Sequence, residues 1–311
     1  MFHITGEENL PVLLGLGIGG GAALLALFLL GFTQLGARSA RLTAGRVLSL
    51  ASATFSARAG ALFTLWISVS LAYTSVTLFT QLVGRTTYLF ETAMAAVLIF
   101  LGHRTMLERP ARDTGIDVPR NGYWRVLLRS LALGLAILLA AGAVFLLAAF
   151  LVALAGSAGL TGALPRIIAG MTAGLAAIWL STLFARLSFI YPASVLGGRD
   201  WFGQALANAA PAALALSASL WVVALISLAL IIPVIIWSES LVLAVASGLT
   251  SPPGEMPGDV GTALFWLRLA IEELPLRLLL VAYSLTSIAC VSAAYRLTVF
   301  ATVEEGAQAD S

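Results

Sequence analysis

Four charged residues near the C-terminal end of the chain have the spacing of paired side chains on one helix face. Arg268 and Glu272 are four residues apart, and so are Glu273 and Arg277. Side chains at this separation are neighbours on an α-helix, so opposite charges pair there. A charge at the centre of a bilayer costs about 2.5–3.5 kcal/mol. The two pairs therefore indicate either a helix at the membrane surface or a buried ion-pair cluster in a transport site.

Polar residues also repeat at helical spacing within an apolar run that begins near residue 60. They are Trp66, Ser70, Tyr73, Thr74, Thr77, Thr80 and Gln81. At 100° per residue these positions occupy one face of a helix. One interpretation is a lining for a water-filled path or for a lipid-headgroup cleft, with Ser70, Thr74 and Thr77 as the lining residues. The other is a set of hydroxyl groups that bond neighbouring helices or their own carbonyls.

Glu91 lies at the start of the next apolar run, six residues after Arg85. A carboxylate there either reaches the water phase along its own side chain or contacts an ion or substrate. The chain has no Gly-Lys-Ser/Thr phosphate loop, no Gly-x-Ser-x-Gly turn and no paired intramembrane aspartates. His3 and His103 are far apart and Cys290 is the single cysteine. We therefore expect no catalytic residues, no metal site and no cofactor.

The elements that must position these residues are membrane helices. The sequence is 60% hydrophobic and 10% charged, whereas a soluble domain has about 25% charged residues. A helix needs about 20 mostly apolar residues to span a bilayer. Seven stretches qualify, at about 12–35, 60–83, 87–105, 127–155, 164–190, 211–237 and 275–298. The expected fold is an all-α polytopic transmembrane bundle in a single domain over residues 1–311, with six or eight spans as alternatives.

Prolines are expected to end two helices, because proline lacks an N–H group and clashes with the preceding turn. Pro192 would stop the fifth span. Pro275 would separate a surface helix over residues 261–273 from the last span. A second surface helix is expected over residues 37–58.

All 17 basic residues are arginines, and thirteen of them fall on one side of the predicted spans. They occupy residues 38–58, 104–129, 186–199 and the end of the last span at Arg296. Because cytoplasmic loops carry the excess of basic residues, this bias places the N-terminus outside and the C-terminus in the cytoplasm. The same arginines are expected to attract anionic lipid headgroups. A net charge of +2, spread over separate loops, indicates no nucleic-acid partner.

Glycines four residues apart predict close contacts between helices, because small residues let backbones approach. The pairs are Gly15 with Gly19, Gly17 with Gly21, and Gly170 with Gly174. We favour packing within the bundle. The alternative is a contact face for a homo-oligomer or for another membrane protein.

The segment from residue 185 to 208 resembles a signature of a bacterial group of integral membrane proteins. The group includes the membrane domain attached to some glycerophosphodiester phosphodiesterases. The matching positions are Arg186, Pro192, Ala193, Val195, Ala205 and Leu206, and the closing Ala293-Ala294-Tyr295-Arg296-Leu297 is similar to the end of that domain. The resemblance covers about residues 185–300 and implies a bacterial cytoplasmic (inner) membrane. The sequence has no counterpart of the catalytic domain, so that activity is not implied.

The expected function is that of a non-enzymatic integral membrane protein, either a scaffold or accessory subunit of a membrane assembly or a lipid-associated module. The first alternative is a small permease, in which Ser70, Thr74 and Thr77 line a path and Arg268 with Glu272 forms a gate. Such a permease requires the three hydroxyl residues to face a continuous cavity open to one side. The second alternative is a membrane-embedded enzyme.

Overall fold

Every regular element in the described part of the chain is helical. The computed structural model describes residues 10–33, 42–83, 88–115, 118–119, 122–157, 162–197, 202–248 and 258–301, without the side chains of 80–83, 88–89, 202, 242–248, 258–270 and 272. The α-helices are α1 (Leu10–Phe32), α2 (Ala44–Ala57), α3 (Ala59–Val83), α4 (Tyr88–Asp113), α5 (Tyr123–Ser157), α6 (Ala163–Leu187), α7 (Ile190–Val195), α8 (Phe202–Ala209), α9 (Ala213–Gly248) and α10 (Gly258–Tyr295). A 3-10 turn, η3 (Ala210–Ala212), precedes α9, and a π-helical turn, η4 (Arg296–Phe300), follows α10.

Seven segments of these helices are long and apolar enough to cross a membrane. They are Leu10–Phe32, Ala59–Phe79, Phe90–Asp113, Tyr123–Ser157, Ala163–Val195, Gly203–Leu241 and Glu273–Phe300. Each predicted stretch has its counterpart among them. The chain is therefore an all-α polytopic bundle of about seven spans, as the sequence predicts.

Pro275 does not end a helix, so the predicted separation of residues 261–273 from the last span is wrong. α10 runs unbroken over 38 residues with Pro275 inside it. The ion pair between Glu273 and Arg277 joins the turns on either side of the proline. Membrane helices tolerate proline because neighbouring groups satisfy the carbonyl that loses its partner. At 1.5 Å per residue α10 is about 57 Å long, well beyond an apolar core of roughly 30 Å.

Pro192 does not terminate the fifth span either. α6 ends at Leu187, and Pro192 lies inside the short helix α7 that follows. The Ser188 carbonyl, which cannot receive a bond from Pro192, accepts one from the Tyr191 N–H at 3.1 Å. Ahead of the proline, this hydrogen bond therefore joins residues three apart in place of the usual four, and the chain then continues as a helix.

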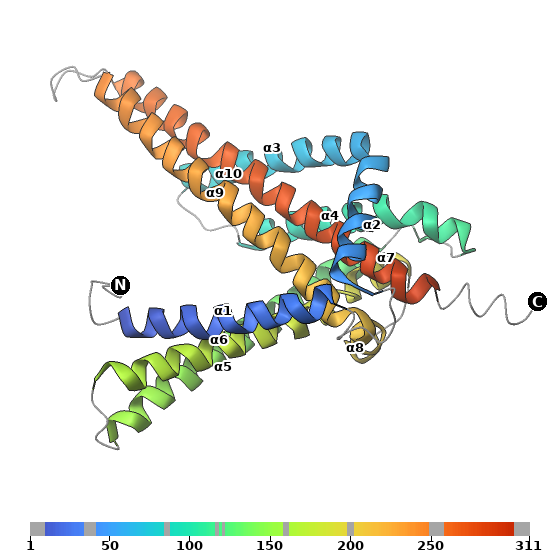
Figure 1. Cartoon of the computed structure of the whole chain (residues 1–311). Helices are drawn as coiled ribbons and strands as arrows, with labels where there is room; N and C mark the ends of the chain where they lie inside the picture. The colour runs from blue at the N-terminus through green and yellow to red at the C-terminus, as the bar shows by residue number, and fades with distance from the viewer. Residues whose placement is uncertain are drawn as a thin grey trace, which may run out of the picture.

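The helices form three groups that diverge from a common junction (Figure 1). One group contains α1, α5 and α6, the second is the pair α9 and α10, and the third is α3 with α4, which also contacts α10. The short helices α2, α7 and α8 lie at the end of the molecule where the groups meet (Figure 1). We call these three groups the arms.

The junction holds the largest fully buried side chains of the described residues. They come from α2, α3, α4, the start of α5, the turn before α7, α7, α9 and α10, and include Val47, Leu62, Met106, Leu107, Val126, Phe189, Ile190, Leu216 and Leu285. By contrast, no residue is buried in the most apolar 18-residue stretch of α5. Apolar surface of that extent is typical of helices that face lipid.

The segment expected as a surface helix at 37–58 contains α2, and residues 37–41 lie outside the described residues. One face of α2 is buried at Ala44, Val47 and Ala51, and the helix contacts α9 and α10. Ser219 of α9 donates a hydrogen bond to the Ala44 carbonyl at 3.3 Å. α2 is therefore an integral part of the junction.

The glycine spacing correctly predicts a contact within the bundle, between α1 and α6. A Cβ atom built on Gly15 would lie 2.0 Å from the Ile167 carbonyl oxygen, and one on Gly170 would lie 2.2 Å from the Val12 carbonyl oxygen. Gly19 and Gly174 occupy the same interface. Gly17 and Gly21, in contrast, face open space, and a Cβ atom at either position would have nothing within 4 Å.

The residues on which the predicted resemblance rests lie in the junction. Pro192, Ala193 and Val195 are buried in α7. The Arg186 guanidinium donates two hydrogen bonds to the Leu206 carbonyl, at 2.8 and 3.3 Å. At the end of α10 the Tyr295 ring packs against Phe189 and Phe300, and Arg296 donates to Thr54 of α2 at 3.2 Å.

The segments that carry most arginines converge on this same end of the bundle. Arg125 reaches the Gly197 carbonyl at 3.3 Å, and Arg129 donates to Ser194 of α7. These bonds join α5 to α7 and to the turn that follows it, the Arg186 contact joins α6 to α8, and the Arg296 contact joins η4 to α2. Several arginines expected at lipid headgroups therefore also bind protein oxygens.

Candidate functional site

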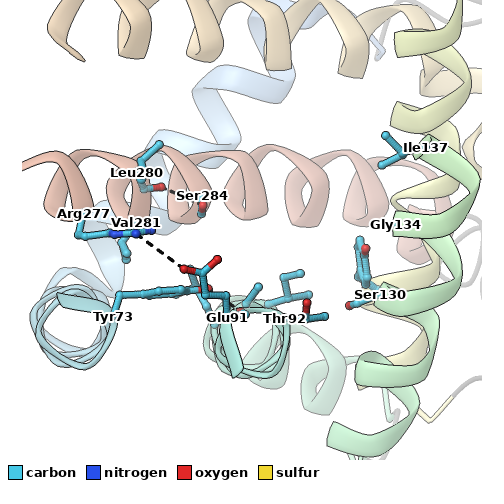
Figure 2. Close-up of a pocket in the computed structure, with 14 residues that line it drawn as sticks. Tyr73, Glu91, Thr92, Ser130, Gly134, Ile137, Arg277, Leu280, Val281 and Ser284 are labelled. Atoms are coloured by element: carbon cyan, nitrogen blue, oxygen red, sulfur yellow. Dashed lines mark hydrogen bonds and ion pairs between the residues drawn. The ribbon is translucent and has the colours of Figure 1, made fainter. Parts of the chain in front are cut away.

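A cavity of about 470 Å³ lies between α3, α4, α5 and α10 (Figure 2), and Tyr191 of α7 also lines it. Most of its wall is apolar, with Ala95, Leu98, Ile99, Ile137, Leu280 and Val281 among the lining residues. The charged residues in the wall are Glu91 and Arg277, which lie close together (Figure 2). The cavity is thus an apolar space with charge at one place.

Arg277 connects three helices at this charged place. Its Nε atom is 3.2 Å from Glu273 Oε2 within α10, and its Nη2 atom is 3.8 Å from Glu91 Oε1 on α4. Nη2 also donates a hydrogen bond to Thr77 Oγ1 of α3 at 3.0 Å. The side chains of Arg277 and Glu273 are 21% and 20% exposed, and that of Glu91 is 39% exposed. We call Glu91, Glu273 and Arg277 the charged cluster.

Tyr73 of α3 holds the charged cluster in place. The Arg277 guanidinium carbon lies 5.7 Å from the centre of the Tyr73 ring, in the range of a cation–π interaction. The Tyr73 hydroxyl donates to the main-chain oxygen of Glu91 at 3.0 Å. α3 therefore fixes both the guanidinium and the turn of α4 that carries Glu91.

The predicted polar stripe of α3 is divided between two environments. Tyr73 lines the cavity and Thr77 binds Arg277. Ser70 and Thr74 are 0% and 6% exposed and line neither of the two cavities described in this section. Trp66 donates its indole N–H to the Leu278 carbonyl of α10 at 2.7 Å. The stripe is mainly a packing face, and none of Ser70, Thr74 and Thr77 lines either of the two cavities described in this section.

Several predicted site residues lie outside the described side chains. These are Arg268 and Glu272 of the expected gate and Thr80 and Gln81 of the stripe. The structure instead brings Glu91 close to the pair Glu273 and Arg277, which lies far from Glu91 in the sequence.

A second cavity, of about 430 Å³, lies between α5, α6, α9 and α10. Ile137 and Tyr191 line both cavities, so the two spaces adjoin at these residues. On the wall of the second cavity, Trp221 donates its indole N–H to the Ser181 hydroxyl at 2.9 Å. Among the described residues, no charged side chain lines it. We call the two cavities together the inter-arm crevice.

The chemistry of the charged cluster is the recognition of ionic groups. A guanidinium binds carboxylate or phosphate oxygens, and a carboxylate accepts hydrogen bonds from ammonium groups. Within the described residues no three His, Cys, Asp or Glu side chains are grouped to hold a metal ion. No protein-family model, no curated protein and no solved structure matches this chain.

His103 is a buried polar residue beside the crevice. α4 continues to Asp113, and His103 lies inside it with 1% of its surface exposed. Its Nδ1 atom shares a 2.8 Å hydrogen bond with Ser292 Oγ of α10, and its ring stacks on Tyr191. Because Tyr191 lines both cavities, His103 and Ser292 lie directly behind this part of the crevice wall. The sequence signal was a histidine within an apolar run, which by itself names no partner.

Ser292→Ala is expected to lower the free energy of unfolding by about 1–3 kcal/mol, because it leaves a buried imidazole nitrogen without its partner. Ser284→Ala on the same helix is the matched control, since that hydroxyl bonds the Leu280 carbonyl of its own helix. SDS titration of the purified protein in mixed micelles measures both. A second change, His103→Leu, added to Ser292→Ala should recover part of the loss. Equal effects of the two serine variants would contradict the assigned bond.

Proposed function

We propose that this chain is a non-enzymatic integral membrane module that holds an amphiphile in the inter-arm crevice. An amphiphile here is a molecule with one polar end and a hydrocarbon chain. The observation that carries the proposal is the charged cluster at one place in a mostly apolar cavity of about 470 Å³. Small-molecule sites have this form, with volumes of about 300–1,000 Å³, apolar walls and a few polar groups that orient the ligand.

The surroundings of the crevice support this proposal. Its walls come from different arms, and the arms expose large apolar side chains such as Phe145, Phe150 and Ile226. In a bilayer those surfaces contact lipid, so hydrocarbon chains are the molecules present around the crevice. In the proposed orientation, the end that carries most arginines faces the cytoplasm.

The permease alternative has less support. Its predicted path runs along Ser70 and Thr74, which are buried in packing contacts of α3. Its predicted gate, Arg268 with Glu272, lies outside the described side chains. The resemblance of residues 185–300 to the membrane domain of glycerophosphodiester phosphodiesterases stays a prediction, and a lipid-binding module without a catalytic domain is compatible with it.

Filling the crevice tests the proposal. Ile137→Trp replaces a branched aliphatic side chain with a bulkier indole ring where the two cavities adjoin. We expect it to reduce the lipid retained by the purified protein in native mass spectrometry. Leu138→Trp is the matched control, because Leu138 is the next residue of α5, is 68% exposed and lines neither cavity. Both variants should unfold at the temperature of the parent protein. Equal lipid retention by the two variants would exclude the crevice as the binding place.

A further inference from the structure

We infer that the polar end of the bound amphiphile carries an ammonium group, and that Glu91 is the residue that binds it. This inference rests on the proposed function and adds the chemical class of the ligand. It starts from the charge balance of the cluster. One guanidinium, that of Arg277, faces two carboxylates, those of Glu91 and Glu273. Among the described residues the cluster therefore carries one negative charge in excess.

The distances assign the excess charge to Glu91. Glu273 binds the Nε atom of Arg277 at 3.2 Å in its own helix, within hydrogen-bond range. Glu91 is 3.8 Å from Nη2, beyond the range of a good hydrogen bond, and its side chain is about twice as exposed as that of Glu273. Arg277 thus forms its tighter contacts with Glu273 and Thr77, and the Glu91 carboxylate is left with a long contact.

Glu91 is also positioned to meet a ligand. It lines the cavity, whereas Glu273 is not among the lining residues. Tyr73 donates a hydrogen bond to the main-chain oxygen of Glu91, so α3 holds the turn of α4 that carries this carboxylate. A carboxylate in surroundings of low dielectric constant attracts a positive charge much more strongly than it does in water. A cation with hydrogen-bond donors, such as an ammonium group, is the complement of such a site.

The apolar part of the cavity wall favours a hydrocarbon chain on that cation. Leu98, Ile99, Leu280 and Val281 offer no hydrogen bonds from their side chains, so beside them a polar group would lose its water without replacement. The hydroxyl groups of Thr92, Ser130 and Ser284 also line the cavity. An ammonium group attached to a hydrocarbon chain satisfies both parts of the wall. Two sources share this chemistry: a phospholipid with an ethanolamine headgroup, and a free long-chain amine.

The test compares headgroups on the full-length protein. The protein is exchanged into mixed micelles with equimolar phosphatidylethanolamine, phosphatidylglycerol and phosphatidylcholine, and native mass spectrometry measures the retained lipids. In a second experiment, dodecylamine or lauric acid is added and the shift in unfolding temperature is measured. The parent protein should prefer phosphatidylethanolamine in the first experiment, dodecylamine in the second experiment, or both. A preference for phosphatidylethanolamine in the first experiment alone identifies the lipid headgroup as the source of the ammonium group. A preference for dodecylamine in the second experiment alone identifies the free amine.

Three variants decide the role of Glu91. Glu91→Gln should reduce the preference for the ammonium compound by about tenfold, which corresponds to about 1.4 kcal/mol, without reducing total lipid retention. Glu91→Asp, which keeps the charge, should retain most of the preference. Glu108→Gln should behave like the parent, because Glu108 lies on α4 away from the cavity and pairs with Arg104 and Arg112.

The inference and the proposed function fail in different ways. An unchanged preference in Glu91→Gln, or a parent protein that prefers phosphatidylglycerol and lauric acid, would overturn the ammonium assignment while leaving amphiphile binding intact. If Ile137→Trp retains as much lipid as the parent protein, the proposed function itself is refuted.

Discussion

Gly15→Ala is expected to lower the free energy of unfolding by about 1–3 kcal/mol or more, the usual cost of overpacking a close contact. The added methyl group would lie 2.0 Å from the Ile167 carbonyl oxygen and 2.9 Å from the Ile167 Cα atom. These are backbone atoms of α6, so no side-chain rotation relieves the clash. The two helices must move apart along their whole contact. SDS titration in mixed micelles measures the loss.

Gly17→Ala is the matched control for this prediction. It makes the same change two residues away on the same helix, and nothing lies within 4 Å of the new methyl group. Alanine is a better helix former than glycine by about 1 kcal/mol, so this variant should be neutral or slightly stabilised. Gly170→Ala, on the opposite side of the contact, should repeat the loss seen at Gly15. Similar unfolding of the Gly15 and Gly17 variants would mean that α1 and α6 do not pack through these glycines.

Arg277→Met is expected to destabilise the protein by about 2.5–3.5 kcal/mol, the scale of one uncompensated charge within a bilayer. The change removes the partner of both Glu273 and Glu91 and the hydrogen bond to Thr77. Thermal unfolding in detergent micelles is the measurement. Adding Glu273→Gln to Arg277→Met should recover part of the loss, because one of the two unpaired carboxylates is then neutral.

Arg112→Met provides the control for the ion pair. Arg112 and Glu108 have the same i,i+4 spacing on α4, at 2.5 Å, but the Arg112 side chain is 71% exposed. Exposed pairs contribute only about 0–1 kcal/mol. A loss in Arg277→Met no greater than that in Arg112→Met would show that the charged cluster does not hold α3, α4 and α10 together.

The seven spans follow from the sequence because a helix in lipid must satisfy its own backbone hydrogen bonds and must be long enough to cross. Both requirements are local. Helix ends were less predictable, as Pro275 and Pro192 show. In water a proline is a strong stop signal, but α10 continues through Pro275, and the chain passes Pro192 with one tighter turn.

The candidate site depended much more on the arrangement of helices in space. Periodicity showed that Glu273 and Arg277 share a helix face, and it placed Tyr73 and Thr77 on one face of α3. It gave no means of joining these residues to Glu91, because the contact requires α3, α4 and α10 to meet. Equally, nothing local distinguishes Ser70 and Thr74, which are buried in packing, from Tyr73, which lines the cavity.

By itself, the sequence determined that the chain is a membrane-spanning helical bundle. Glycine spacing indicated close helix contacts, but only the structure separated Gly15, Gly19, Gly170 and Gly174, which make one, from Gly17 and Gly21, which do not. Composition and residue spacing are properties of each segment alone, and the bilayer imposes the same demands on every segment. Only the tertiary structure decided that the arms diverge from a packed junction, that His103 is buried beneath Tyr191, and that Glu91 meets Arg277 at the crevice. These features depend on which helix faces pack together, and that choice is settled by side-chain fit between segments far apart in the chain.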